Sequence, residues 1–263
     1  SRKRWGSSSS SIIHGDLVFI NALQEGYKIY ALNKSDGKIA WQWGPSAADS
    51  YQDTYGTPAL VKAKDKTELI LAVPGEIWSL DAKKGDITWY AYTNVGAGRG
   101  GNVSPSAIAG GGALYVFGGR PQSGVAVKLG GKGEVKESDH LWTSRNSPYV
   151  ASPVYHEGHL YWMDRSGYAV CLNAKTGREA YRERLKSSSR TPQFYASPVV
   201  VDGKIISVSR NAGTFVLEAK PKFKQLAQNT FASDRSVFNA SPAVSSGRLF
   251  LRSDTHLYCV ASE

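Results

Sequence analysis

The sequence lacks the features that mark several classes of protein. It contains one Met and two Cys among its 263 residues, and no apolar run approaches the roughly 18 residues that a membrane-spanning helix requires. No window shows a sustained 3.6-residue apolar period, so amphipathic helices are not expected to be the main elements. The chain begins at Ser1 and shows no signal peptide, which is consistent with a removed leader or upstream region.

The scarcity of cysteine also argues against a disulfide framework. Cys171 and Cys259 each lie in the middle of a similar phrase, Val170-Cys171-Leu172 and Tyr258-Cys259-Val260. Equivalent positions two repeats apart should lie well beyond the roughly 7 Å limit for the Cα atoms of a disulfide. We interpret both cysteines as small buried residues without a disulfide.

What the sequence does contain is a repeat. Six times a Ser/Thr-Pro step, or a serine cluster in its place, opens an apolar run, and the steps between these starts are 48, 47, 48, 45 and 44 residues. The starts are Ser9, Thr57, Ser104, Ser152, Ser197 and Ser241. Self-similarity at about 40–50 residues is typical of propellers. We therefore predict one all-β domain over residues 1–263, a β-propeller of about six visible four-stranded blades.

The fifth unit shows the expected strands of one blade. Asp202-Gly203 is a strong two-residue hairpin signal because Gly adopts positive φ without strain, and four strands are predicted over 196–201, 204–209, 214–218 and 225–229. The third unit departs from this pattern with a longer excursion, Gly130 to His140, which we interpret as a loop insertion or a decayed corner of the repeat. Aromatic residues four positions after a turn glycine are expected to pack between blades: Trp41, Trp89 and Tyr181.

Two phrases carry a family resemblance. Residues 31–41, Ala-Leu-Asn-Lys-Ser-Asp-Gly-Lys-Ile-Ala-Trp, and residues 171–177, Cys-Leu-Asn-Ala-Lys-Thr-Gly, resemble the repeat of pyrroloquinoline-quinone-like (PQQ-like) propellers. Similar proteins include those of planctomycete-type bacteria and the lipoprotein propeller of the outer-membrane assembly machinery. The resemblance implies a periplasmic or extracellular location in the bacterial envelope. The last unit ends just after its third expected strand, which leaves open either a seven- or eight-bladed ring lacking N-terminal blades here, or a six-bladed ring with one three-stranded blade.

The resemblance leaves open whether the protein is an enzyme. Quinoprotein dehydrogenases of this fold hold their cofactor against a disulfide of adjacent cysteines and a Ca²⁺ ion, and this sequence has no adjacent Cys pair. Neither PQQ nor Ca²⁺ is therefore expected. His156-Glu157-Gly158-His159 falls at a hairpin corner, where a solvated turn is favoured over a metal site. We favour a non-catalytic binding or scaffold protein; the alternative is a quinoprotein-type or carbohydrate-active enzyme with an axial active site.

The candidate binding residues precede the inner strands. Four successive connections each carry an arginine five to seven residues before the Ser-Pro step, and Tyr or Asn stands closer to it. If the loops converge at the channel rim, guanidinium, phenol and amide groups would suit an anionic or polyhydroxyl ligand. The candidate binding residues are Tyr55, Arg99, Asn102, Arg145, Tyr149, Arg190, Tyr195, Arg235 and Asn239; Tyr51, Gln52 and Asp53 lie in the first of these connections.

The charge of the chain points the same way. The formal net charge is +10, which favours anionic neighbours. We expect an anionic polysaccharide or an envelope protein as partner. No nucleic-acid-binding module is present, so no specific nucleic-acid partner is expected. The oligomeric state stays open.

Overall fold

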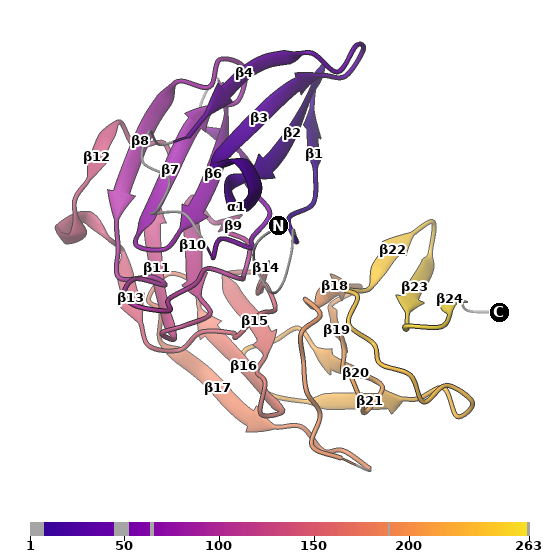
Figure 1. The fold of residues 1–263 in the computed structure, drawn as a ribbon. Helices are drawn as coiled ribbons and strands as arrows, with labels where there is room; N and C mark the ends of the chain where they lie inside the picture. Colours follow the sequence, from indigo (N-terminus) through magenta and orange to yellow (C-terminus); the bar gives the residue numbers. More distant parts are fainter. Residues whose placement is uncertain (1–7, 45–52, 64–65, 189, 262–263) are drawn as a thin grey trace. The chain divides into compact units, whose positions relative to one another are not determined.

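The chain forms two compact units that consist almost entirely of β-sheet. The computed structural model describes residues 8–44, 53–63, 66–188 and 190–261. The units are Ser1–Ser147 and Pro148–Glu263, and each contains three sheets of mostly antiparallel strands (Figure 1). The predicted all-β class is confirmed, whereas the organisation as one domain stays a prediction.

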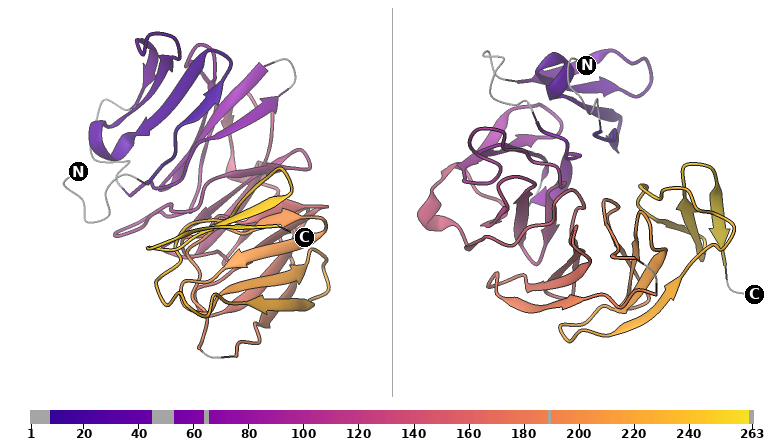
Figure 2. Two further views of the ribbon diagram at one scale, coloured as in Figure 1. Left: turned by 90° about the vertical axis from the view of Figure 1, so that its right-hand side faces the viewer. Right: turned by 60° about the horizontal axis from the view of Figure 1, so that its bottom comes forward.

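The first unit contains three sheets that stand next to one another (Figures 1 and 2). Sheet 1 has the order β1-β2-β3-β4, sheet 2 the order β12-β8-β7-β6-β5, and sheet 3 the order β13-β11-β10-β9. The strands are β1 (Ile12–His14), β2 (Leu17–Ala22), β3 (Lys28–Asn33), β4 (Ile39–Trp43), β5 (Ala59–Ala63), β6 (Lys66–Val73), β7 (Glu76–Asp81), β8 (Ile87–Tyr92), β9 (Ile108–Gly110), β10 (Ala113–Gly118), β11 (Ser123–Lys128), β12 (Gly133–Val135) and β13 (Trp142–Ser144).

The second unit repeats the arrangement in residues 148–263. Sheet 4 has the order β14-β15-β16-β17, sheet 5 the order β18-β19-β20-β21, and sheet 6 has three strands in its described part, β22-β23-β24. The strands are β14 (Val154–His156), β15 (His159–Met163), β16 (Tyr168–Asn173), β17 (Glu179–Arg184), β18 (Val199–Val201), β19 (Lys204–Val208), β20 (Thr214–Glu218), β21 (Gln225–Asn229), β22 (Ala243–Ser245), β23 (Arg248–Arg252) and β24 (Leu257–Val260).

The first hairpin of each sheet in the second unit is a two-residue turn. Asp202 and Gly203 have φ values of 47° and 68°, so both central residues adopt the positive φ of a type I′ turn. Glu157 and Gly158 have φ values of 44° and 76°, which places the His-Glu-Gly-His phrase at a hairpin corner as predicted. The last two strands predicted for the fifth unit, 214–218 and 225–229, match β20 and β21 residue for residue.

The excursion Gly130 to His140 is not a simple loop insertion, so that prediction is wrong in part. Its residues Gly133–Val135 form β12, which pairs in parallel with β8 of the preceding sheet. A short 3₁₀ helix, η1 (Glu137–Asp139), follows. The insertion therefore adds a fifth strand to sheet 2, because the unpaired edge of β8 offers backbone donors and acceptors to an adjacent segment.

The aromatic residues predicted between blades lie between neighbouring sheets, where Trp89 and Tyr181 are buried and Trp41 is half-buried. Trp89 is fully buried in the cluster between sheets 2 and 3, and its indole Nε1 donates to Glu68 Oε2 at 2.9 Å. Trp41 of sheet 1 donates from Nε1 to the Ala82 carbonyl of sheet 2 at 3.2 Å, and Tyr181 lies in the cluster between sheets 4 and 5. Burying each large aromatic side chain contributes roughly 2–3 kcal/mol to folding, so these contacts hold neighbouring sheets together.

A recurring hydroxyl links neighbouring inner strands. The backbone N–H of Ser10 donates to Thr57 Oγ1 and that of Thr57 to Ser106 Oγ, both at 3.0 Å. In the second unit, the Ser152 N–H donates to Ser197 Oγ and the Ser197 N–H to Ser241 Oγ, both at 2.9 Å. We call this residue the slot residue. It lies two positions before each inner strand, so it is Ser10 and Ser106 in the first and third units rather than Ser9 and Ser104.

The two cysteines differ in environment although they occupy the same strand position. Both are free, and Cys171 is buried as predicted. Burial raises the pKa of its thiol to about 12. Cys259 is exposed, so the prediction that it is buried is wrong. Its strand β24 is the edge of a sheet that has three strands in the described residues, and no fourth strand of that sheet covers it there.

The described part of the chain contains one α-helix, α1 (Leu23–Gly26). This helix has four residues. None of the helices in the described residues has the length and apolar character needed to cross a membrane.

Candidate functional site

Two of the predicted tyrosines lie together in the second unit. Tyr149 and Tyr195 each precede an inner strand, and their ring centroids are 6.2 Å apart with a 56° angle between the planes. Both side chains are half-buried. The connections before β14 and β18 therefore bring one tyrosine from each of two sheets into contact.

An arginine lies over each of the two tyrosine rings, and neither arginine was among the predicted site residues. Arg165 Cζ lies 5.0 Å from the centroid of Tyr149, and Arg210 Cζ lies 4.3 Å from that of Tyr195. Both distances are within the range of a cation–π interaction. These arginines come from the turns between the second and third strands of sheets 4 and 5, whereas the predicted site residues all lie in the connections before inner strands.

The turns that carry the two arginines are fixed by the residue before each arginine. Asp164 Oδ1 accepts hydrogen bonds from the backbone N–H groups of Ser166 and Tyr168 at 2.8 and 3.0 Å. In the next sheet, Ser209 Oγ accepts from the N–H groups two and three residues later, at 3.2 and 2.7 Å. A side-chain acceptor followed by Arg, repeated 45 residues later, is the signal in the sequence that could have identified Arg165 and Arg210.

Arg210 joins two connections as well as stacking on a ring. Its Nε donates to Asn239 Oδ1 at 2.7 Å, its backbone N–H donates to the Gln193 carbonyl at 2.8 Å, and its carbonyl accepts from the Phe238 N–H at 3.3 Å. Arg210 of sheet 5 thus contacts the connection before β18 and the connection before β22. The predicted site residues Tyr195 and Asn239 are brought together through it.

Three arginines line one small cavity of about 230 Å³ in the second unit. Two of them, Arg190 and Arg235, were predicted, and the third is Arg210. We call this cavity the arginine pocket. Its other polar lining includes Asn211, Thr214, Thr230, Asp234 and Ser236, and its apolar lining includes Phe231 and Phe238. Guanidinium groups converging on one cavity suit a carboxylate or another oxyanion, which each group can bind in a two-pronged manner.

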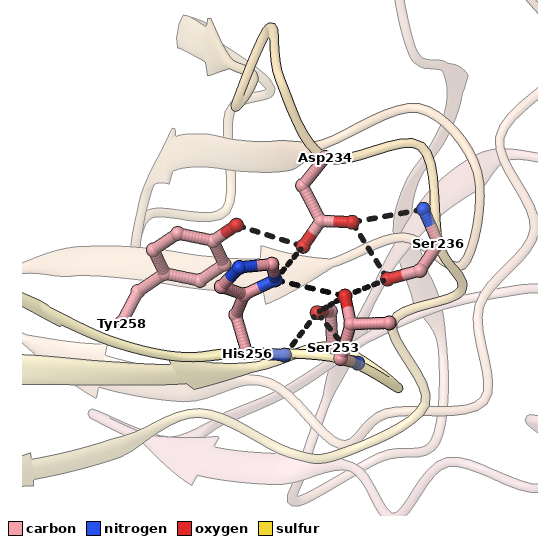
Figure 3. A network of polar contacts seen from close by, with 6 residues as sticks. Asp234, Ser236, Ser253, His256 and Tyr258 are labelled. Atoms are coloured by element: carbon pink, nitrogen blue, oxygen red, sulfur yellow. Dashed lines mark hydrogen bonds and ion pairs between the residues drawn. The ribbon is translucent and has the colours of Figure 1, made fainter.

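A polar network around Asp234 fixes the loop that carries Arg235 (Figure 3). Asp234 Oδ1 accepts from the backbone N–H and hydroxyl of Ser236 at 2.9 and 2.6 Å, and Oδ2 accepts from the Tyr258 hydroxyl at 2.8 Å. His256 Nδ1 lies 3.6 Å from Oδ2. The hydrogen bonds from Ser236, together with Ser253, hold the pKa of Asp234 far below its ordinary value. The side chain is 3% exposed; this burial by itself would raise the pKa, but the hydrogen bonds outweigh it, so the carboxylate remains ionised at neutral pH.

The charge balance of the arginine pocket favours an anion. Asp234 is the one carboxylate among the lining residues, and its two oxygens already accept hydrogen bonds from Ser236 and Tyr258. Three arginines therefore face one occupied carboxylate. Arg190 and Arg235 are exposed and Arg210 is half-buried, so a ligand in the pocket would meet positive charge that solvent only partly screens.

The candidates of the first unit do not form a comparable cluster. The Tyr55 hydroxyl donates to Asp53 Oδ1 at 3.1 Å, and burial, aided by Asp53, raises the pKa of Tyr55 to about 12. Asn102 Oδ1 accepts from the Ser104 hydroxyl at 3.2 Å. Arg99 is exposed, and Arg145 lines a different, larger cavity. Tyr51 and Gln52 lie outside the described residues.

The residues do not match a quinone-dependent dehydrogenase. The two cysteines, Cys171 and Cys259, are not adjacent in the sequence, and both are free thiols. The chain therefore lacks the adjacent cysteine pair that holds the quinone in such enzymes. Within the described ranges, no group of three or more His, Cys, Asp or Glu side chains could hold a metal ion. Ca²⁺ takes six to eight oxygen ligands, many of them carboxylate oxygens.

Solved structures with low sequence identity share this fold. BamB from Moraxella catarrhalis matches with a TM-score of 0.72 at 16% identity, covering 97% of this chain and 72% of that one. A quinohemoprotein alcohol dehydrogenase from Comamonas testosteroni matches with a TM-score of 0.62 at 12% identity, covering 86% and 43%. These matches confirm the β-propeller fold, which an assembly factor and a dehydrogenase both use. Fold alone therefore does not assign an activity.

Sequence comparison is more specific. The outer membrane protein assembly factor BamB of Salmonella typhimurium strain LT2 is 26% identical over 212 residues, which cover 79% of this chain and 47% of that protein. The chain spans about half the length of the curated relatives it matches. The PQQ_2 family model, described as outer membrane protein assembly factor BamB, matches residues 1–138 and 131–221. The chain thus belongs to the PQQ_2 family of BamB-like repeat proteins.

Proposed function

We propose that this chain is a non-catalytic scaffold of the bacterial envelope that binds an acidic segment of a partner protein at the arginine pocket. The family supports an envelope role, because its name refers to assembly of outer membrane proteins. The observation that carries the proposal is the convergence of Arg190, Arg210 and Arg235 on one cavity. The cavity is small, about 230 Å³, so it fits one or two carboxylate side chains rather than a large cofactor.

The surrounding geometry supports a preformed site. Arg210 is held by Tyr195 and Asn239, and the loop of Arg235 is held by the hydrogen bonds of Asp234. Side chains that are ordered before binding lose less conformational entropy when the partner arrives. The pair of Arg165 and Tyr149 lies outside the pocket and contacts the pair of Arg210 and Tyr195 through the two tyrosine rings.

The test is binding of labelled hexaglutamate and hexaglutamine peptides, measured by fluorescence anisotropy at two ionic strengths. The triple variant Arg190→Ala/Arg210→Ala/Arg235→Ala should bind hexaglutamate at least about tenfold more weakly, equivalent to ~1.4 kcal/mol. Lys175→Ala/Arg178→Ala/Lys222→Ala removes the same charge from exposed positions outside the pocket and is the matched control. Equal losses in both variants would show attraction by net charge alone and would contradict the proposal.

The envelope location has its own test. Cells that produce the full-length protein are fractionated, and the protein is followed by immunoblotting. The proposal expects it in the envelope fraction. Recovery with the cytosolic markers would contradict this part of the proposal without affecting the peptide-binding result.

A further inference from the structure

The insertion in the third unit builds a cavity that is distinct from the arginine pocket. This cavity has a volume of about 710 Å³ and lies in the first unit. We propose that it binds a short neutral oligosaccharide, and we call it the insertion cavity. Its walls come from four segments: residues 92–95 from the end of β8 onward, residues 121–125 at the start of β11, residues 134–137 and 140 of the insertion, and residues 143–145 at the end of β13.

The origin of the cavity is the first argument. Residues 130–140 depart from the repeat, and β12 leaves its own sheet to pair with β8. Val135 of β12 packs against the core between sheets 2 and 3, which anchors the insertion. In repeat proteins, insertions into single repeats often carry the binding surface. A volume of about 710 Å³ is within the range of small-molecule sites.

The charge of the lining selects a neutral ligand. The charged lining residues are two acidic ones, Glu134 and Glu137, and two basic ones, Lys136 and Arg145, so their formal charges balance. Burial lowers the pKa of His140, which makes its imidazole neutral at pH 7. The insertion cavity therefore lacks the excess of positive charge that characterises the arginine pocket.

Hydrogen-bonding capacity is available in the cavity. Exposed Asn94 and Thr143 line this space. Their amide and hydroxyl groups both donate and accept hydrogen bonds. A sugar hydroxyl also does both, so it matches this lining better than an ion of either sign.

An aromatic ring completes the site. Tyr92 lines the cavity and is 55% exposed. It contacts Tyr90 edge-on, with centroids 5.7 Å apart, and Tyr90 stacks on Trp78 at 5.1 Å. Tyr92 is therefore supported from behind by packed rings while part of its own ring stays accessible. The ring provides an apolar surface for the C–H face of a sugar, and its hydroxyl stays available for a hydrogen bond.

The proposal is tested by calorimetric titration of the whole chain with maltotriose, cellotriose and chitotriose. At least one of them should bind, and Tyr92→Ala and Asn94→Ala should each weaken that binding by about tenfold. Both side chains are exposed, so the variants should fold, which thermal melting checks. The matched controls are Ile39→Ala, which is also 55% exposed, and Asn229→Ala, which is exposed on β21; neither should change binding.

The outcomes separate this site from the arginine pocket. The triple arginine variant should bind the trisaccharide as the unmodified chain does, because its replaced residues lie in another cavity. If none of the three sugars binds, or if the controls weaken binding as much as Tyr92→Ala, the proposal is wrong. Displacement of hexaglutamate by the sugar would also overturn it, since the two ligands would then share one site.

Discussion

Arg210 lies over the ring of Tyr195, with its Cζ atom 4.3 Å from the ring centroid. The same guanidinium donates from Nε to Asn239 at 2.7 Å. Two different contacts thus fix one side chain that also lines the arginine pocket. The ring of Tyr195 contacts one face of the planar guanidinium, and Asn239 accepts a hydrogen bond from its Nε edge. The remaining N–H groups therefore have a defined direction.

This geometry predicts that Arg210→Lys weakens peptide binding although the charge is unchanged. An ammonium group has no planar fork and stacks poorly on a ring. We expect hexaglutamate affinity to fall about fivefold, equivalent to ~1 kcal/mol, by fluorescence anisotropy. Arg178→Lys, at an exposed position outside the pocket, should leave the affinity unchanged. Unchanged affinity in Arg210→Lys would mean that this side chain contributes charge alone.

A second prediction concerns the buried pair of Trp89 and Glu68. Both side chains are fully buried, and the indole donates to the carboxylate at 2.9 Å. Trp89→Phe leaves a smaller ring and a buried carboxylate that has lost a donor. We expect the free energy of unfolding in urea to fall by about 3 kcal/mol, from the cavity and the lost charge-assisted hydrogen bond together.

Trp41 provides the control for this prediction. Its indole donates to a neutral carbonyl, that of Ala82, and the side chain is half-buried, so Trp41→Phe should cost about 1 kcal/mol. Adding Glu68→Gln to Trp89→Phe should recover part of the loss, because a neutral amide costs less to bury. Equal costs for Trp89→Phe and Trp41→Phe would contradict the role given to Glu68.

A third prediction concerns pH and Asp234. Hydrogen bonds from Ser236, with Ser253, lower the pKa of Asp234 in the folded protein below its ordinary value of 3.8. The unfolded chain therefore binds a proton first as the pH falls. The stability contributed by Asp234 should be fully present above about pH 4 and should decrease at lower pH, whereas Asp234→Asn carries no such dependence.

The measurement is urea denaturation of the unmodified chain and of Asp234→Asn between about pH 2 and pH 6. This range lies on both sides of the ordinary pKa of an aspartate side chain. The gap in unfolding free energy between the two proteins should be constant at the upper end and should narrow towards the lower end. A gap that stays constant across the range would show that the Asp234 network does not lower the carboxyl pKa.

A fourth prediction separates the two thiols. Burial raises the pKa of Cys171 to about 12, so at pH 8 almost no reactive thiolate forms there. A disulfide reagent should modify one thiol of the native protein, the exposed Cys259, and both after unfolding. Native Cys259→Ser should not react. Rapid modification of two thiols in the native protein would contradict the burial of Cys171.

The sequence was sufficient for features that depend on neighbouring residues. The turn at Asp202-Gly203 needs positive φ at both positions, and the Gly makes that readable from the sequence. Trp89 was placed between sheets because its position after a turn glycine recurs in other units. The exposure of Cys259 was not predictable from its strand position, because burial depends on the number of strands in its sheet.

The features missed by sequence reasoning depend on distant pairing. β12 lies more than 40 residues after β8 in the chain and pairs with it in parallel, so no local pattern marks it. Arg165 and Arg210 lie in turns remote from the Ser-Pro steps. Only their tertiary contacts with Tyr149 and Tyr195 bring them to the candidate site. The tyrosines themselves were predicted, because Tyr149 and Tyr195 stand three and two residues before the Ser-Pro steps at Ser152 and Ser197.

The slot residues have an implication for how such a chain can change in length. Thr57 and Ser197 each supply both halves of the junction, an amide donor toward one neighbour and a hydroxyl acceptor toward the other. Any blade with a slot residue before its inner strand can form this hydrogen bond with any other blade that has one. Gene duplication or deletion could therefore add or remove whole blades without requiring a new contact between inner strands. The number of blades can thus vary in evolution while the hydrogen bond between neighbouring slot residues stays the same.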